Sequence, residues 1–497
     1  MIAMDLIVAG FSAVLSLQAV ALMFVGVIVG IIFGSIPGLS AVTAIALALP
    51  LTFAMDPTVA IALMMSIYVG GSSGGFIAAI LLNIPGTPAS VATTFDGHPM
   101  AQKGQAGKAL GTAVVCSFLG GLVSMVALLT LAPPLASISM RFGAAEYFAT
   151  TFFALVLLGG LTGGSLVKGL ISGLLGLLLA TIGSAPIDYT DRFTFGFVGL
   201  SGGLSAPVVL IGIFAISEVV KAARRKALPA AKARSMQIRG FGVELREIAG
   251  QSINILRSAI IGVFVGVLPG IGGSAASLLS YSAARGASKK PEEFGKGSTE
   301  GLVASESANN AVMGGAMIPL LTLGIPGDVV TALLLGALML YGLSPGPLLM
   351  LTDADLLYAI FAAMLISNCI MLVVQFAGIR LFVKALSVDR VILLPVIISM
   401  CAVGVYSFNN TSFDVVLFSL FGLFGYVCFK LEFPFPPLVV GFILGPILEV
   451  NLRRGLMLND GNFLAFFSSP IAATFFVASI GFILFTVWKR RMEPVKA

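Results

Sequence analysis

The chain has 497 residues, of which 58% are hydrophobic and only 10% are charged, and its formal net charge is +6 at pH 7. In a typical soluble protein roughly a quarter of the residues are charged. So few charged residues cannot cover a soluble globule of this size, which excludes an ordinary cytosolic enzyme. Together with a mean hydropathy of +1.07, the repeated apolar stretches of about 18 or more residues predict an all-α polytopic membrane protein.

The first half of the chain, residues 1–220, begins with a predicted re-entrant helical hairpin at 18–51. The apolar first arm of this hairpin ends at Pro37-Gly38. Proline removes a backbone donor and glycine permits positive φ, so a Pro-Gly step interrupts a helix. A second Pro-Gly step breaks the next predicted helix, at 58–93, and about four further spans complete this half.

A basic cytoplasmic linker is predicted at 221–249, and the second half, 250–497, repeats the order of the first. It has a predicted re-entrant hairpin at 254–284, a Pro-Gly-broken helix at 303–337 and about five further spans. Three landmarks in one order predict an internal repeat. The landmarks are GVIVGIIFGSIPG (26–38) with GVFVGVLPG (262–270), NIPGTPAS (83–90) with GIPGDVVT (324–331), and PVVLIGIFAISEV (207–219) with PLVVGFILGPILEV (437–450).

The charges of equivalent loops indicate how the two halves are oriented. The loop at 51–57 holds no Lys or Arg, whereas its counterpart at 285–296 is basic. For the next pair of loops the difference is reversed, since 94–108 holds two lysines and 341–356 holds no Lys or Arg. Because cytoplasmic loops carry the excess of Lys and Arg, the pattern predicts two repeats of inverted topology. We expect a periplasmic N-terminus and a cytoplasmic C-terminus. Of the 28 basic residues, this orientation leaves outside only Arg141, Arg192, Arg453 and Arg454.

Four interruptions lie at the hairpin tips and in the broken helices: 34–40, 83–90, 268–274 and 324–329. Irregular backbone at membrane depth is tolerated only where it is buried in protein or faces water. The freed carbonyls can coordinate a cation, and the helix N-termini that follow can bind an anion. Simple kinking of packed helices is the alternative, but paired breaks in matching positions favour a transport site near the bilayer midplane.

Hydroxyl, amide and backbone groups of these interruptions are therefore predicted to form the site. The substrate-binding residues are predicted to be Ser35, Pro37, Gly38, Ser40, Pro85, Gly86, Thr87, Gly270, Gly272, Gly273, Ser274, Asn309, Asn310, Pro326 and Gly327. The predicted ion-binding residues are Ser35, Asn83, Thr87 and Asp328. Packing is the alternative role for each hydroxyl residue. The segments GGSSGG (70–75) and SESANN (305–310) are expected to line the same cavity, with close helix packing as the alternative role for the glycines.

An acidic residue directly after Pro326-Gly327 is costly at membrane depth and is by default a functional hypothesis. Asp328 would bind a cation or carry a proton, and a loop position nearer the surface is the alternative. The four cysteines lie in apolar runs without a partner His, so we expect buried residues rather than metal ligands. Glu449 and Arg453, at helical i,i+4 spacing, are expected to form a structural pair. No cofactor and no metal other than a coupling Na⁺ is predicted.

Long motifs, in order, cover nearly the whole chain. They include GSIPGLSAVTAIALALPLTF (34–53), LLNIPGTPASVATTFDGHPMAQKGQAGKALG (81–111), VGVLPGIGGSAAS (265–277) and ESANNAVMGGAMIPLLTLGIPGD (306–328). In these motifs the chain resembles the large membrane subunit of the tripartite tricarboxylate transporters. The resemblance implies a bacterial inner-membrane protein that imports small organic carboxylates on an Na⁺ or H⁺ gradient. It also implies a periplasmic solute-binding protein and a small membrane subunit as partners. Paired hairpins followed by broken helices are also similar to elevator-type ion transporters.

The predicted function is therefore the transport subunit of a binding-protein-dependent secondary active importer of tricarboxylates or dicarboxylates. A stand-alone permease that needs no binding protein is one alternative. A channel without ion coupling is another. An intramembrane enzyme is disfavoured, because no His, Cys or pair of acids converges at one depth, and no catalytic residue is predicted.

Overall fold

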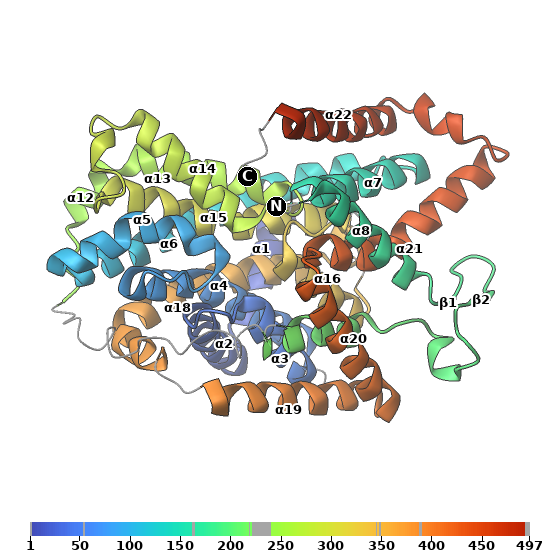
Figure 1. The fold of residues 1–497 in the computed structure, drawn as a ribbon, viewed down its shortest axis with the longest axis horizontal. Helices are drawn as coiled ribbons and strands as arrows, with labels where there is room; N and C mark the ends of the chain where they lie inside the picture. The colour runs from blue at the N-terminus through green and yellow to red at the C-terminus, as the bar shows by residue number, and fades with distance from the viewer. Residues whose placement is uncertain are drawn as a thin grey trace.

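A computed structural model describes residues 2–52, 55–161, 165–217, 219–220, 240–343, 345–346, 349–386 and 390–492. Within these residues the chain folds almost entirely into helices that pack side by side (Figure 1). Seven of the described helices are long and apolar enough to cross a membrane, in agreement with the predicted polytopic membrane protein. Of the basic linker predicted at 221–249, residues 221–239 lie outside the described residues.

The first half contains a helical hairpin followed by a broken helix. Its elements are α1 (Ile2–Val14), α2 (Leu17–Ser35), α3 (Ala41–Thr52), α4 (Pro57–Leu82), η1 (Pro88–Ser90) and α5 (Val91–Met100). The hairpin is α2 with α3, and the broken helix is α4 with η1 and α5; α1 is a helix that the sequence analysis does not predict. The Asp56 side chain caps α4 by accepting a hydrogen bond from the Thr58 N–H at 2.9 Å. The helix ends at Asn83, whose φ of 56° is left-handed.

The second half also contains a helical hairpin followed by a broken helix. Its elements are α12 (Leu245–Gly250), α13 (Ser252–Val267), α14 (Gly272–Ala287), η5 (Pro291–Glu293), α15 (Thr299–Leu323) and α16 (Val329–Leu340). The hairpin is α13 with α14, and the broken helix is α15 with α16. The Ser298 hydroxyl caps α15 by accepting a hydrogen bond from the Gly301 N–H at 3.4 Å. This helix ends at Gly324, which is left-handed with a φ of 70°.

Each hairpin packs its first arm closely against the broken helix that follows it in the chain, α2 on α4 and α13 on α15. A Cβ atom at Gly30 would lie only 2.4 Å from the Ile67 carbonyl oxygen. A Cβ atom at Gly266 would lie 2.5 Å from the Val312 carbonyl oxygen. Small residues at these positions let the backbones approach closely, which is how helices without a hydrophobic driving force associate in a bilayer.

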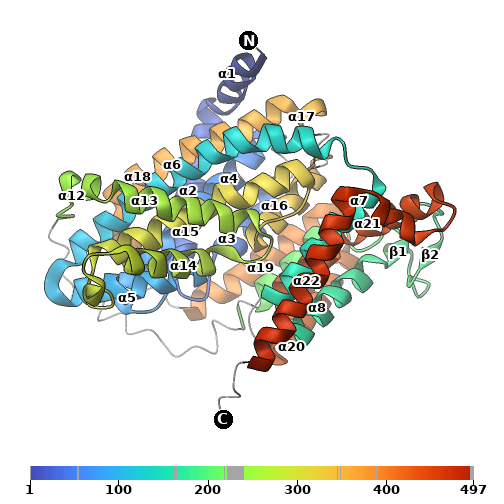
Figure 2. The same ribbon diagram turned by 90° about the horizontal axis from the view of Figure 1, so that it is seen from above.

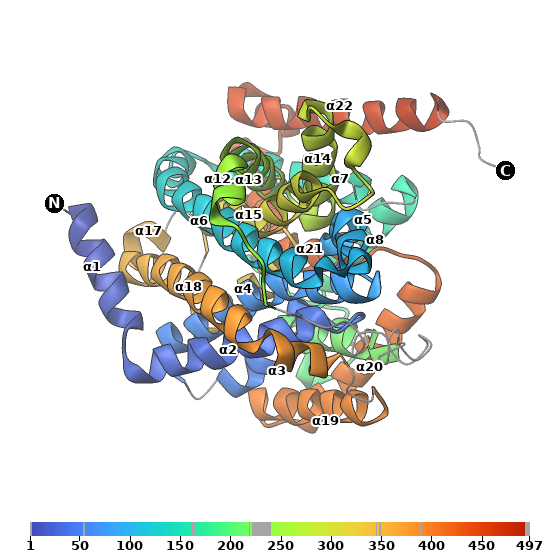
Figure 3. The ribbon, with the colours of Figure 1, turned by 90° about the vertical axis from the view of Figure 1, so that its left-hand side faces the viewer.

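The remaining helices surround these two units. They are η2 (Ala101–Gln105), α6 (Ala106–Ser139), α7 (Ala144–Leu161), α8 (Leu166–Ala180), η3 (Val198–Leu200), α9 (Ala206–Ile211), η4 (Gly212–Ile216), α17 (Leu349–Thr352), α18 (Ala354–Ala385), α19 (Arg390–Asn409), α20 (Ser412–Lys430), α21 (Phe435–Leu458), η6 (Phe463–Ser468) and α22 (Pro470–Met492). Figure 2 shows α7, α8, α21 and α22 together on one side and α6, α12 and α13 on the other. Helices α19 and α22 lie on opposite outer faces (Figure 3).

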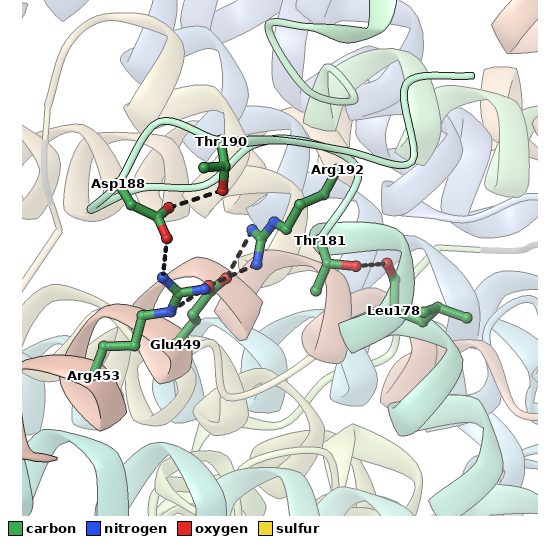
Figure 4. A network of polar contacts seen from close by, with 7 residues as sticks. All are labelled: Leu178, Thr181, Asp188, Thr190, Arg192, Glu449 and Arg453. Carbon is green, nitrogen blue, oxygen red and sulfur yellow. Dashed lines mark hydrogen bonds and ion pairs between the residues drawn. The ribbon is translucent and has the colours of Figure 1, made fainter. Parts of the chain in front are cut away.

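A short β-ribbon, which the sequence analysis does not predict, is held to α21 by an ionic network (Figure 4). Its strands β1 (Gly183–Ser184) and β2 (Asp191–Arg192) pair antiparallel. Arg192 donates two hydrogen bonds to Glu449, at 2.7 and 3.1 Å. Arg453 reaches Glu449 at 2.9 Å and Asp188 at 3.1 Å, which confirms the predicted Glu449–Arg453 pair and gives it a structural role.

Candidate functional site

The interruptions of the two halves surround one cavity of about 600 Å³. This volume lies within the range of about 300–1,000 Å³ that is typical of small-molecule sites. Both hairpins and both broken helices contribute to its wall, together with Phe214 of η4 and the start of α21. The predicted residues on the wall are Ser40, Thr87, Gly270, Gly272, Gly273, Ser274, Asn309 and Asp328. Residues far apart in the sequence thus meet in one place.

The other predicted residues do not line this cavity. They are Ser35, Pro37, Gly38, Asn83, Pro85, Gly86, Asn310, Pro326 and Gly327. Ser35 is fully buried, and its hydroxyl donates to a carbonyl of its own helix at 2.9 Å. A Cβ at Gly86 would lie 2.4 Å from the Gly34 carbonyl oxygen, and one at Gly327 would lie 2.5 Å from the equivalent carbonyl of α13. These two glycines therefore shape the breaks and do not contact the contents of the cavity.

Five helical segments begin at the cavity wall. Their first residues, all of which line it, are Ala41 of α3, Pro88 of η1, Gly272 of α14, Val329 of α16 and Phe435 of α21. The N-terminus of a helix carries unsatisfied N–H groups and a partial positive charge. The described wall contains no Lys, Arg or His, so these helix N-termini are the positively polarised groups that it offers.

The N-terminus of α14 is open toward this cavity. No side chain caps it, since its N-cap residue is Ile271. The preceding turn is left-handed at Gly270, with a φ of 78°, and at Gly272, with a φ of 68°, where a side chain would be strained. The Gly270 N–H donates to the Gly327 carbonyl at 2.7 Å and fixes the hairpin tip to the second break.

Asp328 caps the N-terminus of α16. Its Oδ1 accepts hydrogen bonds from the Thr331 N–H at 2.7 Å and from the Thr331 hydroxyl at 2.8 Å. Its Oδ2 accepts a hydrogen bond from the Tyr68 hydroxyl at 2.8 Å. The side chain is half-buried at the cavity wall and does not lie in an exposed loop. Its negative charge is stabilised by the helix terminus that it caps.

Tyr68 is a cavity residue that the sequence analysis misses. It is only 1% exposed and lines the cavity from α4. The helices α4 and α15 end at the left-handed residues Asn83 and Gly324. Counted back from those ends, Tyr68 and Asn309 hold the same position, and both line the cavity. Tyr68 could therefore be identified from the sequence by aligning the two halves at their breaks and counting backwards.

The two neighbouring asparagines of α15 have different partners. Asn309 lines the cavity, and its Nδ2 donates to the Ser72 carbonyl at 3.2 Å. Asn310 is fully buried away from the wall. Its Oδ1 accepts a hydrogen bond from Ser73 at 2.7 Å, and its Nδ2 donates to Ser117 at 2.8 Å. Of the predicted pair, only Asn309 is placed to contact a ligand in the cavity.

The Thr87 hydroxyl is a polar group at the wall that has no hydrogen-bond partner among the described residues. Its side chain is nevertheless buried, with the residue 9% exposed. Buried hydroxyls are normally paired, so an unpaired one beside a cavity is available to a ligand or to water. The neighbouring Ser90 hydroxyl is already engaged, since it donates to the Thr87 carbonyl at 2.9 Å.

Metal and thiol chemistry have little support in the described ranges. There, no group of three or more His, Cys, Asp or Glu side chains is placed to hold a metal ion. Cys116, Cys401 and Cys428 are buried free thiols, as expected, whereas Cys369 is exposed on α18. The expectation for Cys369 is wrong because an apolar run in a membrane helix includes residues on its outer surface as well as residues in the core.

Comparison with known proteins identifies relatives over most of the chain. The sequence profile of the family described as "Tripartite tricarboxylate transporter TctA family" matches residues 20–440. An Agrobacterium vitis protein, described as an uncharacterized 52.8 kDa protein in the TAR-I ttuC' 3' region, is 38% identical over 96% of this chain and 94% of its own length. Another Agrobacterium vitis protein, in the TAR-II ttuC' 3' region, is 42% identical over 43% of this chain and 88% of its own length.

Proposed function

Because the chain belongs to the tripartite tricarboxylate transporter TctA family, we propose that it is the large transmembrane subunit of a binding-protein-dependent importer. Its substrates are small organic carboxylates of the tricarboxylate or dicarboxylate type. A periplasmic solute-binding protein delivers the substrate, and a small membrane subunit completes the complex. The chain lies in the bacterial inner membrane with its N-terminus periplasmic and its C-terminus cytoplasmic, and an Na⁺ or H⁺ gradient drives uptake.

The observation that carries this proposal is the convergence of helix N-termini on a cavity whose described lining has no basic residue. A substrate carboxylate would accept hydrogen bonds from the open N–H groups at the start of α14. The Asn309 amide and the unpaired Thr87 hydroxyl would bind further carboxylate oxygens. Such a site holds an anion by dipoles instead of a salt bridge, so the anion is released more readily than from a paired Arg, as a transport cycle requires.

Asp328 explains why the substrate would travel with a cation. Its carboxylate lies on the same wall as the proposed anion site, and two negative charges in one low-dielectric cavity repel each other strongly. A cation or a proton at Asp328 removes this repulsion. Binding of substrate and of coupling ion would therefore favour each other, which is the thermodynamic requirement for coupled transport.

The movement that we propose follows from the matched halves. Two repeats of inverted topology, each with a re-entrant hairpin and a Pro-Gly-broken helix, would form one core around the cavity. This core would move as a body against the remaining helices and expose the cavity to one side of the membrane at a time. The close glycine contacts of α2 on α4 and of α13 on α15 support movement of each pair as a unit.

Uptake by the purified complex in proteoliposomes tests the proposed function. The large subunit, the small subunit and the binding protein are combined, and uptake of ¹⁴C-labelled citrate, malate and acetate is measured under imposed Na⁺ and pH gradients. We expect di- or tricarboxylate uptake that follows one of the gradients and needs the binding protein. Full uptake without the binding protein would favour a stand-alone permease. Uptake indifferent to every gradient would contradict ion coupling and favour a channel.

A further inference from the structure

Glu306 is a buried carboxyl that does not line the cavity. It lies within α15, and its side chain is 0% exposed. Two hydroxyls donate to it: that of Thr93, in α5, to Oε1, and that of Ser117, in α6, to Oε2 at 3.2 Å. No basic side chain among the described residues interacts with this carboxyl. The group therefore lacks the cationic partner that a buried carboxylate normally needs.

A permanent negative charge is unfavourable in such surroundings. Burying an unpaired ion costs several kcal/mol even after the protein relaxes, and a buried carboxyl without a cation tends to take up a proton instead. Ionisable residues inside membrane helices commonly belong to ion pathways or proton relays. Structural anchoring is the other explanation, and a neighbouring carboxyl shows what an anchor looks like in this chain.

Asp96 is that anchor. It is also 0% exposed, but its Oδ1 accepts hydrogen bonds from the backbone N–H groups of Gly295 at 2.9 Å and of Gly297 and Ser298 at 2.8 Å. Its Oδ2 accepts a hydrogen bond from the Tyr281 hydroxyl at 2.9 Å. A backbone N–H can only donate, so three of these four partners need an acceptor oxygen on Asp96. Asp96 therefore fixes the loop before α15.

The two hydroxyl partners of Glu306 differ from backbone donors. The hydroxyls of Thr93 and Ser117 can each donate or accept. When Glu306 takes up a proton, its new O–H donates to one hydroxyl, which rotates to accept it, and the other carboxyl oxygen still accepts from the second hydroxyl. The Asn310 Nδ2 continues to donate to the Ser117 hydroxyl at 2.8 Å in either state. The same contacts thus serve both protonation states.

We propose that Glu306 is a proton-binding site of the transport cycle and carries a coupling proton that is separate from any cation at Asp328. This inference rests on the proposed function, because a coupling proton has a role only in a coupled transporter. The proton binds to the carboxylate from one side of the membrane and leaves to the other, and no other bond forms or breaks. Both hydroxyls donate directly to the carboxyl, and a proton is the coupling ion that can bind there without separating these groups.

Short polar connections join Glu306 to the cavity and to the first broken helix. The Asn309 side chain, which lines the cavity, also stabilises the Glu306 carboxylate. A second connection runs from Ser117 through Asn310 to Ser73 in α4, with hydrogen bonds of 2.8 and 2.7 Å. A change of charge at Glu306 therefore alters polar contacts in both broken helices, and at the asparagine proposed to bind substrate.

Few other titratable groups are placed to interfere. Those on described elements packed against α15 are Lys108 and Cys116 of α6, Arg257 of α13, Tyr281 and Arg285 of α14, Asp96 and His98 of α5, and Tyr68 of α4. Among them, the Cys116 thiol interacts electrostatically with Glu306. The variant Cys116→Ser therefore serves as a background in which only the carboxyl remains to titrate near this position.

Infrared difference spectroscopy on the purified full-length chain tests the site without a substrate. The C=O stretch of protonated carboxylic acids is followed while the pH is lowered, in H₂O and in D₂O. We expect a titrating, deuterium-sensitive band in the wild type that Glu306→Gln lacks. The control is Glu432→Gln, which removes a carboxyl whose side chain is 85% exposed. Identical buried-acid bands in the wild type and in Glu306→Gln would overturn the proposal.

The hydroxyl partners give a test that a merely structural role would not pass. Thr93→Val removes a donor that stabilises the carboxylate, so the infrared band should titrate at a higher pH than in the wild type. Thr93→Ser keeps the hydroxyl and should restore the original midpoint. An unchanged midpoint in Thr93→Val, with the protein folded, would contradict the proposed role of the hydroxyls.

Transport in proteoliposomes links the site to coupling, with ¹⁴C-citrate as the probe. For each coupled proton, a gradient of one pH unit supports about a tenfold accumulation ratio. We expect Glu306→Gln to lose the contribution of this proton. Uptake with the pH gradient, divided by uptake without it, should then fall to about one. A full gradient response in Glu306→Gln would overturn the inference. Absence of citrate uptake by the wild type, with the infrared band present, would count against the proposed function and leave the proton site standing.

Discussion

The two Pro-Gly breaks share a backbone design but differ in chemistry. In each, the first helix ends at a left-handed residue, Asn83 or Gly324, and a Pro-Gly step leads to the next helix. The residue after the step differs. Thr87 keeps its hydroxyl unpaired beside the cavity, whereas Asp328 is held by the helix it caps and by a tyrosine from the other half. The shared backbone creates the cavity, and the residue after the Pro-Gly step makes its two sides unequal. Thr87 is neutral and its hydroxyl is unpaired, whereas Asp328 is an acidic residue whose oxygens already accept hydrogen bonds.

The largest effect is expected from adding a side chain to the glycine of each break, where the backbone of a hairpin packs closely. Gly86→Ala and Gly327→Ala would each place a Cβ within about 2.5 Å of a backbone oxygen of the adjacent hairpin. Overpacking of this kind costs about 1–3 kcal/mol, so both variants should melt at lower temperature in detergent and transport poorly. Gly336→Ala is the matched control, because its Cβ would meet only the Leu210 side chain, at 3.6 Å. Wild-type melting of the first two variants would show that the breaks are looser than described.

The charge of the second break is tested by Asp328→Asn. Asparagine is as good a helix cap as aspartate, so the Thr331 N–H keeps its acceptor and the fold should persist. The negative charge is lost, and with it the proposed attraction for a cation. We expect gradient-driven uptake to fall about tenfold or more, equivalent to about 1.4 kcal/mol, with little change in expression. Equal losses of expression and uptake would reduce Asp328 to a structural cap.

The neutral side is tested by removing hydroxyls that differ in their partners. The Thr87 hydroxyl has no described partner, so Thr87→Val should leave the melting temperature unchanged. If this hydroxyl binds substrate, the variant should weaken substrate affinity by about 1 kcal/mol, or about fivefold. Thr331→Val should lower the melting temperature and leave substrate affinity unchanged, because the Thr331 hydroxyl donates to Asp328 and does not line the cavity. The two variants measured together distinguish substrate binding from helix capping. Equal losses of substrate affinity in both would show that the Thr87 hydroxyl does not bind substrate.

The same comparison explains what the sequence alone could predict. Both breaks are local features, set by Pro-Gly steps and by the residues at the helix ends, so their places are readable from the chain. Which residues of the long helices face the cavity depends on the rotation of each helix, which local sequence does not fix. The analysis therefore includes Asn310, which points away from the wall, and misses Tyr68. Counted from the breaks, 70–75 corresponds to 311–316 and not to 305–310, although both predicted segments contribute to the wall.

Buried polar contacts were the least accessible to sequence analysis. The hydroxyl partners of Glu306 lie 213 and 189 residues away in the chain, so no spacing rule connects them. The predicted tip at 34–40 contributes only Ser40 to the wall, whereas the tip at 268–274 contributes most of its turn. Equivalent sequence positions therefore did not guarantee equivalent exposure, since packing against neighbouring helices decides which groups reach the cavity.

The smallest expected effect comes from the contact that joins the two halves at the second break. Tyr68→Phe removes only the hydroxyl that donates to Asp328 at 2.8 Å, and the ring still fills its place in α4. One neutral donor to a half-buried carboxylate is worth about 1.5 kcal/mol after exchange with water, the low end for hydrogen bonds to charged groups. If that hydroxyl helps to position the Asp328 carboxyl group, its loss should lower gradient-driven uptake, but by less than Asp328→Asn does. In an Asp328→Asn background, Tyr68→Phe should cause no further loss, because no carboxylate remains for Tyr68 to contact. An equal loss in both backgrounds would assign the effect to packing, and the tyrosine hydroxyl would then have no role at this side of the cavity.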